Sequence, residues 1–154
     1  MRAVGEAATP YRPADAQIAY HLALFITLVR SLSIDPIVVR QNWLDAYDYT
    51  TDCGAAVLND YARTNDPFAR VGKESVTVQI PSVVHASDSS FNVCWTEQRF
   101  VNGTPAGTQR WNAVISTVLQ IPRTEQRLRK YPPGIYVNGL SWSRELDATE
   151  GAKP

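Results

Sequence analysis

The sequence lacks the features that mark several large classes of protein. Lys plus Arg and Asp plus Glu both number 15 among 154 residues, so no overall field attracts nucleic acid or an acidic substrate. The most apolar run, Leu22–Val29, is far shorter than the ~20 residues that span a bilayer. The N-terminal residues carry no apolar core of a signal peptide. We therefore expect no direct contact with nucleic acid and no membrane span within this sequence.

Catalytic and metal-binding motifs are missing as well. The sequence contains no nucleophile elbow, HExxH, phosphate-binding loop or GxGxxG, and we expect no cofactor. Its two cysteines, Cys53 and Cys94, lie on different predicted elements without CxxC or metal-type histidine spacing, so a metal site is not expected. Buried free thiols are the favoured interpretation of this pair, and a single disulfide is the alternative.

The two histidines are the remaining candidates for acid–base chemistry. His21 is predicted on the flank of a long helix, and His85 near the end of the first strand. His21 with Asp48 or Asp35 would form an acid–base pair if the fold brought them within reach. A structural histidine beside an apolar helix face is the favoured interpretation, so we do not expect an enzyme.

A helical first half is what the sequence does contain. In Ala14–Ser33 apolar residues recur at helical spacing along one face: Ile18, Leu22, Phe25, Val29 and Leu32. This pattern predicts a long helix whose apolar face must lie against a large partner surface.

Two shorter helices are predicted after it. Asp35 and Pro36 provide the cap and the first residue of a helix over Pro36–Tyr49. A third helix begins at Thr51 or Asp52 and ends at the stop signal Asn65-Asp66-Pro67.

From Lys73 the apolar period changes to two, which is typical of strands. Four antiparallel strands are predicted, around Val76–Ile80, Phe91–Thr96, Gln109–Ile121 and Gly134–Arg144. Pro81 suggests that the first is an edge strand or carries a bulge, and Asn102-Gly103 is typical of a hairpin. Gln109–Ile121 has apolar residues on both faces, which predicts a central strand covered on both sides.

These elements predict one α+β domain at 14–146, between an arm at 1–13 and a polar tail at 147–154. A long N-terminal helix and two shorter helices would pack on a curved four-stranded antiparallel sheet that curls around the first helix.

The residues inside this curved sheet distinguish between two classes of function. A small-molecule enzyme or binding domain needs convergent ionisable groups facing a cavity, whereas a scaffold fills the space. The aromatic residues favour filling: Phe25, Trp43, Phe91 and Trp95.

Two segments of the second half are candidate contact surfaces. In KYPPGIYV two prolines and a glycine make a rigid corner, and five residues form the predicted partner contact: Tyr131, Pro132, Pro133, Gly134 and Tyr136. The alternative is that Pro-Pro-Gly shapes the start of the last strand.

A basic cluster lies just before this corner: Arg123, Arg127, Arg129 and Lys130. It suggests contact with phosphate, lipid headgroups or an acidic partner, and a solvated loop is the favoured alternative.

The sequence also contains, in this order, VRSLSIDPIVVRQNWLDAYDYTT, LNDYARTNDPFARVG, SSFNVCWTEQ and PPGIYVNGLSWSREL. These segments resemble the TrbF conjugal-transfer proteins, a family related to the eighth VirB component of type IV secretion systems. The resemblance covers about Ala14–Leu146, nearly all of the predicted domain.

The resemblance implies a periplasmic domain with a fold like that of nuclear transport factor 2. The domain would belong to a bacterial inner-membrane protein whose membrane helix lies outside this sequence. It implies no catalytic activity, self-association as a dimer or higher oligomer, and contacts with other subunits of the secretion channel. The family's Asn-Pro-x-Gly turn, linked to these contacts, corresponds to Tyr131-Pro132-Pro133-Gly134, with Tyr131 in place of asparagine.

Overall fold

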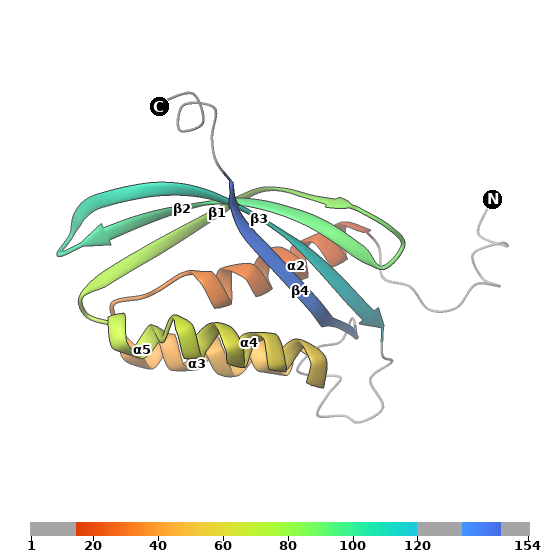
Figure 1. Ribbon diagram of the computed structural model, residues 1–154, viewed down its shortest axis with the longest axis horizontal. Coiled ribbons are helices and arrows are strands. Elements are labelled where there is room, and N and C mark those ends of the chain that lie inside the picture. The colour runs from red at the N-terminus through yellow and green to blue at the C-terminus, as the bar shows by residue number, and fades with distance from the viewer. Residues whose placement is uncertain (1–14, 120–133, 146–154) are drawn as a thin grey trace, which may run out of the picture.

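A computed structural model describes residues 15–119 and 134–145, so the predicted arm and the predicted polar tail lie outside the described residues. The described part contains the helices α2 (Asp15–Arg30), α3 (Pro36–Asp48), α4 (Asp52–Thr64) and α5 (Pro67–Arg70). The strands β1 (Glu74–His85), β2 (Ser90–Val101), β3 (Thr104–Leu119) and β4 (Ile135–Glu145) follow in the sequence (Figure 1).

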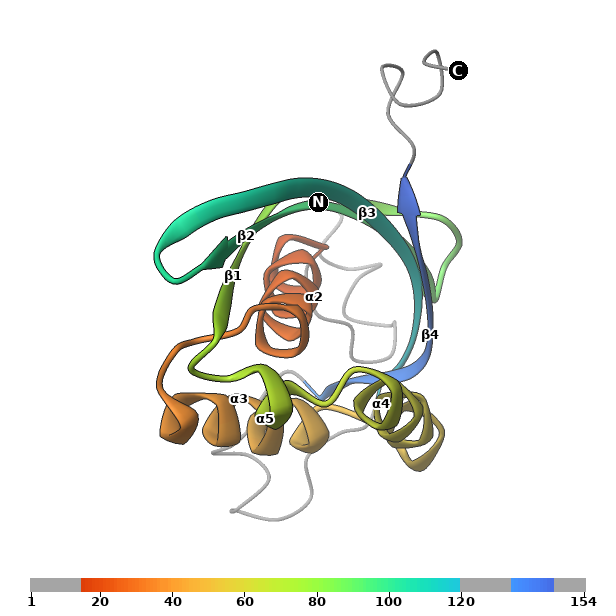
Figure 2. The same ribbon diagram turned by 60° about the vertical axis from the view of Figure 1, so that its left-hand side comes forward.

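The four strands form an antiparallel sheet in the order β1-β2-β3-β4. The sheet curves around α2, and the other helices lie across its open side (Figure 2). This arrangement confirms the predicted α+β class and the predicted curl of the sheet around the first helix. None of the helices described in 15–119 is long and apolar enough to cross a membrane.

The helix α2 lies inside the curve because its apolar side chains need burial on more than one side. The predicted series is buried along its whole length: Ile18, Leu22, Phe25, Val29 and Leu32. The aromatic residues predicted to fill the interior are buried as well: Phe25, Trp43, Phe91 and Trp95. Burying each such side chain contributes about 1.5–3 kcal/mol, so this interior is a main source of stability.

The starts of the helices follow the capping signals of the sequence. Asp35 Oδ1 accepts a hydrogen bond of 2.9 Å from the Ile37 backbone N–H, as predicted for the cap of α3. Asp66 Oδ1 accepts one of 2.9 Å from the Phe68 backbone N–H and so begins α5. We predicted only a helix stop at Asp66-Pro67, and the short helix was missed.

The first helix is shorter than predicted. It ends at Arg30 rather than at Ser33. Just beyond that end, Leu32 exchanges two backbone hydrogen bonds of 3.0 Å with Val76 of β1. This bridge ties the end of α2 to the edge of the sheet, because the backbone groups of Leu32 bond to a strand instead of continuing the helix.

The irregularities of the strands lie where the sequence indicated them. β1 is an edge strand, and its register with β2 shifts between Gln79 and Ser82, around Pro81. β1 continues past Pro81 to His85, the residue predicted near the end of that strand. Asn102 and Gly103 join β2 to β3 with φ of 54° and 80°, as a two-residue hairpin turn requires.

The prediction that the third strand is covered on both sides is wrong. Val114 of β3 is 46% exposed and Val84 of β1 is 55% exposed, because the helices described here pack on the concave face of the sheet (Figure 2). The register of β3 with β4 also shifts between Ser116 and Thr117, which interrupts the simple alternation of faces.

The prediction of two buried thiols is also wrong in part. Both cysteines are free, but Cys53 is exposed and Cys94 is half-buried. Cys53 lies in the first turn of α4, a helix that buries Gly54 and Leu58. Cys94 lies on β2 between the buried Val93 and Trp95, and alternation therefore turns it to the opposite face.

Candidate functional site

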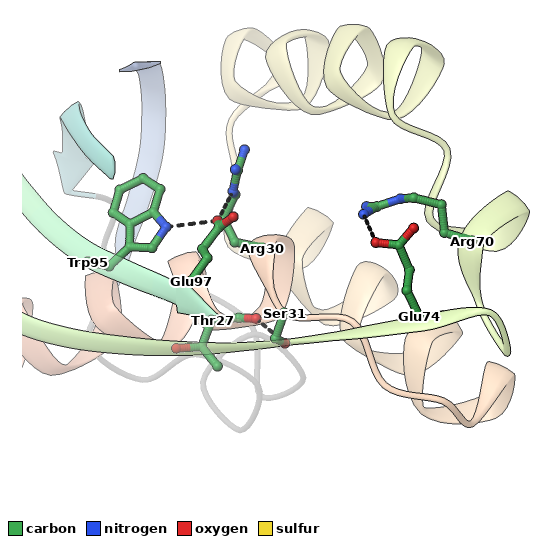
Figure 3. A network of polar contacts seen from close by, with 7 residues as sticks. All are labelled: Thr27, Arg30, Ser31, Arg70, Glu74, Trp95 and Glu97. Carbon is green, nitrogen blue, oxygen red and sulfur yellow. Dashed lines mark hydrogen bonds and ion pairs between the residues drawn. The ribbon is translucent and has the colours of Figure 1, made fainter. Parts of the chain in front are cut away.

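A buried arginine lies at the end of α2. The side chains of Arg30 and Glu97 are 6% and 12% exposed, and Arg30 Nε lies 2.5 Å from Glu97 Oε2. Trp95 Nε1 donates a hydrogen bond of 2.9 Å to the same carboxylate oxygen. Figure 3 shows these three side chains converging from α2 and β2. A buried charge is tolerated only when it is paired and hydrogen-bonded, and this carboxylate provides the pairing.

Aromatic rings surround the guanidinium group of Arg30. Its Cζ atom lies 4.1 Å from the ring centroid of Trp111 and 4.9 Å from that of Trp142. The rings of Tyr61 and Trp95 lie at 5.2 Å and 5.8 Å. Rings within about 6 Å attract a cation through their quadrupoles. We call this set of six residues the Arg30 cluster: Arg30, Tyr61, Trp95, Glu97, Trp111 and Trp142.

The strand period of two assembles the cluster on the concave face of the sheet. Trp95 and Glu97 are two residues apart on β2, and Trp95 pairs directly with Trp111 of β3. Trp142 of β4 pairs with Ala113, the next inward residue of β3. Tyr61 joins from α4, where its ring stands at 74° to that of Trp142 with centroids 4.9 Å apart.

A pocket of about 370 Å³ opens beside the Arg30 cluster. Its walls come from α2, α4, α5 and all four strands, and its charged lining is mostly cationic: Arg30, Arg70, Arg99, Arg144 and Glu97. Glu74 of β1 also lies 3.8 Å from Arg70 Nη1 and 3.5 Å from Arg99 Nη1. Among the described residues, four arginines and two carboxylates therefore lie at the pocket, and this balance suits an anionic group.

Two donors at this pocket find no acceptor among the residues that the structure describes. Within the described part of the chain, the buried Nε of Arg70 and the buried Nε1 of Trp111 have no hydrogen-bond partner. Both residues line the pocket. A buried donor without an acceptor costs about 1–3 kcal/mol, so these two atoms mark a place where an acceptor oxygen would be favourable.

The histidine candidates lie elsewhere. His21 is half-buried on α2, and burial holds its pKa below the usual 6.5. It does not line the pocket beside Arg30. Asp35, one of its proposed partners, caps α3. His85 lies at the exposed end of β1, where its Nδ1 is 3.1 Å from the carbonyl oxygen of Ser87.

The predicted partner contact is described only in part. Tyr131, Pro132, Pro133 and the basic cluster Arg123–Lys130 lie outside the described residues. Gly134 has φ of +70°, and Tyr136 is only 4% exposed. Because Tyr136 is buried, a partner that binds at this corner would touch the residues around Tyr136 rather than its side chain. The corner stays a prediction.

The comparison with protein families decides the class of this chain. The model of the VirB8 protein family matches residues 1–145. The chain belongs to the VirB8 family. It is thus a component of a type IV secretion or conjugal-transfer system, as the sequence segments predicted.

Relatives and solved structures agree with this family. The conjugal transfer protein TrbF of Rhizobium radiobacter is 28% identical over 128 residues, which are 81% of this chain and 58% of that protein. The VirB8 structure from Agrobacterium tumefaciens matches at TM-score 0.74 and 14% identity, covering 91% of this chain and 99% of that one. A TrwG component from Bartonella birtlesii matches at TM-score 0.72 and 18% identity, covering 89% and 95%. The two structures confirm the fold.

Proposed function

We propose that this VirB8-family chain is a non-enzymatic assembly subunit of a conjugative type IV secretion apparatus. It would act by associating with itself and by binding other subunits of the inner-membrane complex. We place the domain in the periplasm, as part of a protein anchored in the inner membrane. Family membership supports this placement, and the chain spans 58% of the length of its TrbF relative.

The observation that best supports a non-enzymatic role is the filled interior of the curved sheet. Phe25, Phe91 and Trp95 are at most 3% exposed there. The buried charge among them, Arg30, is paired with Glu97 and enclosed by aromatic rings. An arginine does not release its proton in a protein, and the Glu97 oxygen nearest to Arg30 already accepts two hydrogen bonds. This arrangement stabilises the interior of the fold rather than transferring protons.

The alternative is a small-molecule enzyme or binding domain that uses the interior of the fold. The pocket beside Arg30 is the observation that favours it, because its volume of about 370 Å³ suits a small ligand. In the described part of the chain, the ionisable lining consists of four arginines and one engaged glutamate. Such a lining favours binding of an anion over acid–base catalysis.

Deleting the gene in its conjugative host separates the two roles. An assembly subunit predicts that the remaining inner-membrane subunits no longer co-purify as one complex and that plasmid transfer stops. Restoring the full chain on a second plasmid should restore both. An enzyme predicts that transfer stops while the complex still co-purifies, and this result would contradict the proposal.

A further inference from the structure

We propose that the pocket beside Arg30 binds a carboxylate side chain from an acidic segment of a partner subunit. The inference rests on the proposed assembly role, because it names the chemistry of one partner contact. Its first support is charge: Arg70, Arg99 and Arg144 line the pocket together with Arg30. Arginines present paired N–H groups that match the two oxygens of a carboxylate.

The second support is the pair of donors for which the described residues offer no acceptor. Arg70 Nε and Trp111 Nε1 come from α5 and β3, two different walls of the pocket. Arg70 shares Glu74 with Arg99 at 3.8 Å and 3.5 Å, so one carboxylate serves two cations. A carboxylate inside the pocket would offer acceptor oxygens to these donors and would place a negative charge beside the arginines.

The third support is the structure of the walls. Trp111 and Trp142 are held against Arg30 at 4.1 Å and 4.9 Å by cation–π contacts. The ion pair with Glu97 holds the guanidinium group of Arg30 in place. The site therefore exists before the ligand arrives, which lowers the entropic cost of binding. Aromatic and arginine residues of this kind are the usual anchors of protein interfaces.

The variant that isolates this site is Trp111→Phe. It removes the indole N–H for which residues 15–119 and 134–145 contain no acceptor, but keeps an aromatic ring beside Arg30. A merely structural Trp111 would lose nothing at the pocket, whereas a carboxylate-binding one loses a charge-assisted hydrogen bond. The expected loss of affinity is about ten- to a hundredfold. Trp43→Phe is the matched control, because Trp43 is buried in α3 and does not line the pocket.

The experiment uses the full chain and synthetic peptides that tile the other subunits of the same secretion apparatus. Every peptide that binds is remade with Asn and Gln in place of Asp and Glu. The chain has four tryptophans, and the indole N–H signal that Trp111→Phe removes identifies Trp111 in NMR spectra. We expect acidic peptides to shift that signal and to lose affinity both in the amide versions and with Trp111→Phe.

Several outcomes would overturn the inference. If the peptides with Asn and Gln bound as tightly as the acidic ones, the pocket would not recognise a carboxylate. Binding of sodium benzoate with no binding of any acidic peptide would assign the pocket to a free small acid instead of a partner. Intact co-purification of the complex alongside either result would leave the assembly role standing. If the other subunits co-purified equally well without this chain, the proposed function itself would be wrong.

Discussion

Arg30 and Glu97 lie 67 residues apart in the sequence, and their side chains form an ion pair of 2.5 Å inside the curve of the sheet. The pair joins the end of α2 to β2, and Trp95 completes it through the hydrogen bond to Glu97. It lies where the central helix, the sheet and the pocket meet. The shape of the pocket therefore depends on the same two residues that hold the end of α2 against the sheet.

Replacing Glu97 by Gln should lower the free energy of unfolding by about 3 kcal/mol, because Arg30 then stays buried without its counter-ion. Urea denaturation measures this loss. Glu145→Gln is the matched control, since Glu145 pairs with Arg110 at a site where the side chains are 31% and 58% exposed. The control should cost less than about 1 kcal/mol. Equal losses in the two variants would contradict a buried, energetically important pair.

The sequence predicted much of the fold because local patterns determine much of it. The apolar series of α2 and the Asp35-Pro36 cap were confirmed because each signal acts within a few residues. The Asn102-Gly103 turn was confirmed for the same reason. Asp66-Pro67 repeats the capping signal of Asp35-Pro36, and α5 could have been predicted from that likeness.

The candidate site could not be predicted in the same way. Arg30 at the end of a helix is also explained by the helix dipole, and its real partner comes from a strand 67 residues later. A weak signal was present: Trp95, Glu97 and Arg99 alternate on one face of β2. Charges that follow a buried tryptophan at a period of two lie on the same face of the sheet as that tryptophan. Only the fold shows which residues meet them there.

Trp95 and Trp111 differ in the state of their indole N–H, and this difference should appear in stability. Trp95→Phe breaks a hydrogen bond of 2.9 Å to Glu97 and removes a donor from a charged acceptor, a loss of about 1.5–3 kcal/mol. Trp111→Phe removes a donor that has no acceptor in the described residues. We expect the Trp111→Phe variant to be clearly more stable than the Trp95→Phe variant in thermal and urea denaturation. The reverse order would show that Trp111 Nε1 is satisfied.

Gly54 lies where α4 comes close to the backbone of β4. A Cβ atom there would lie 2.2 Å from the carbonyl oxygen of Val137, a backbone atom. Gly54→Ala should therefore cost about 2 kcal/mol or more, although the same change normally stabilises a helix by about 1 kcal/mol. Gly139→Ala is the matched control, since its Cβ would meet only the movable Oγ of Ser116 at 2.5 Å. A stabilising Gly54→Ala would show that the contact between α4 and β4 is loose.

The stability of the fold should fall on mild acidification because of His21. Burial lowers its pKa below 6.5, so the unfolded chain binds a proton more readily than the folded one. The contribution of neutral His21 is fully present above pH 6.5 and is lost as the pH falls through the lowered pKa. Denaturation midpoints measured between neutral and mildly acidic pH should show this slope. The slope should shrink in His21→Gln and persist in His85→Gln, because His85 lies at an exposed strand end.

The predicted partner corner remains to be tested through self-association. Sedimentation velocity over a concentration series should show a reversible dimer for the full chain, and a charge at the corner should remove it. Gly134→Trp is the direct test, but Gly134 has φ of +70°, where any side chain strains the backbone. Tyr131→Asp is the safer variant because it leaves the glycine in place.

Ile37→Asp is the control for that experiment. Ile37 lies in the first turn of α3 and is 77% exposed, so the new charge changes an apolar surface without opening the core. Loss of the dimer in Tyr131→Asp and its retention in Ile37→Asp would assign self-association to the corner. The opposite result would move the interface to the first turn of α3. If the chain were monomeric at every concentration, the corner would not mediate self-association, and its expected role would be contact with other secretion subunits.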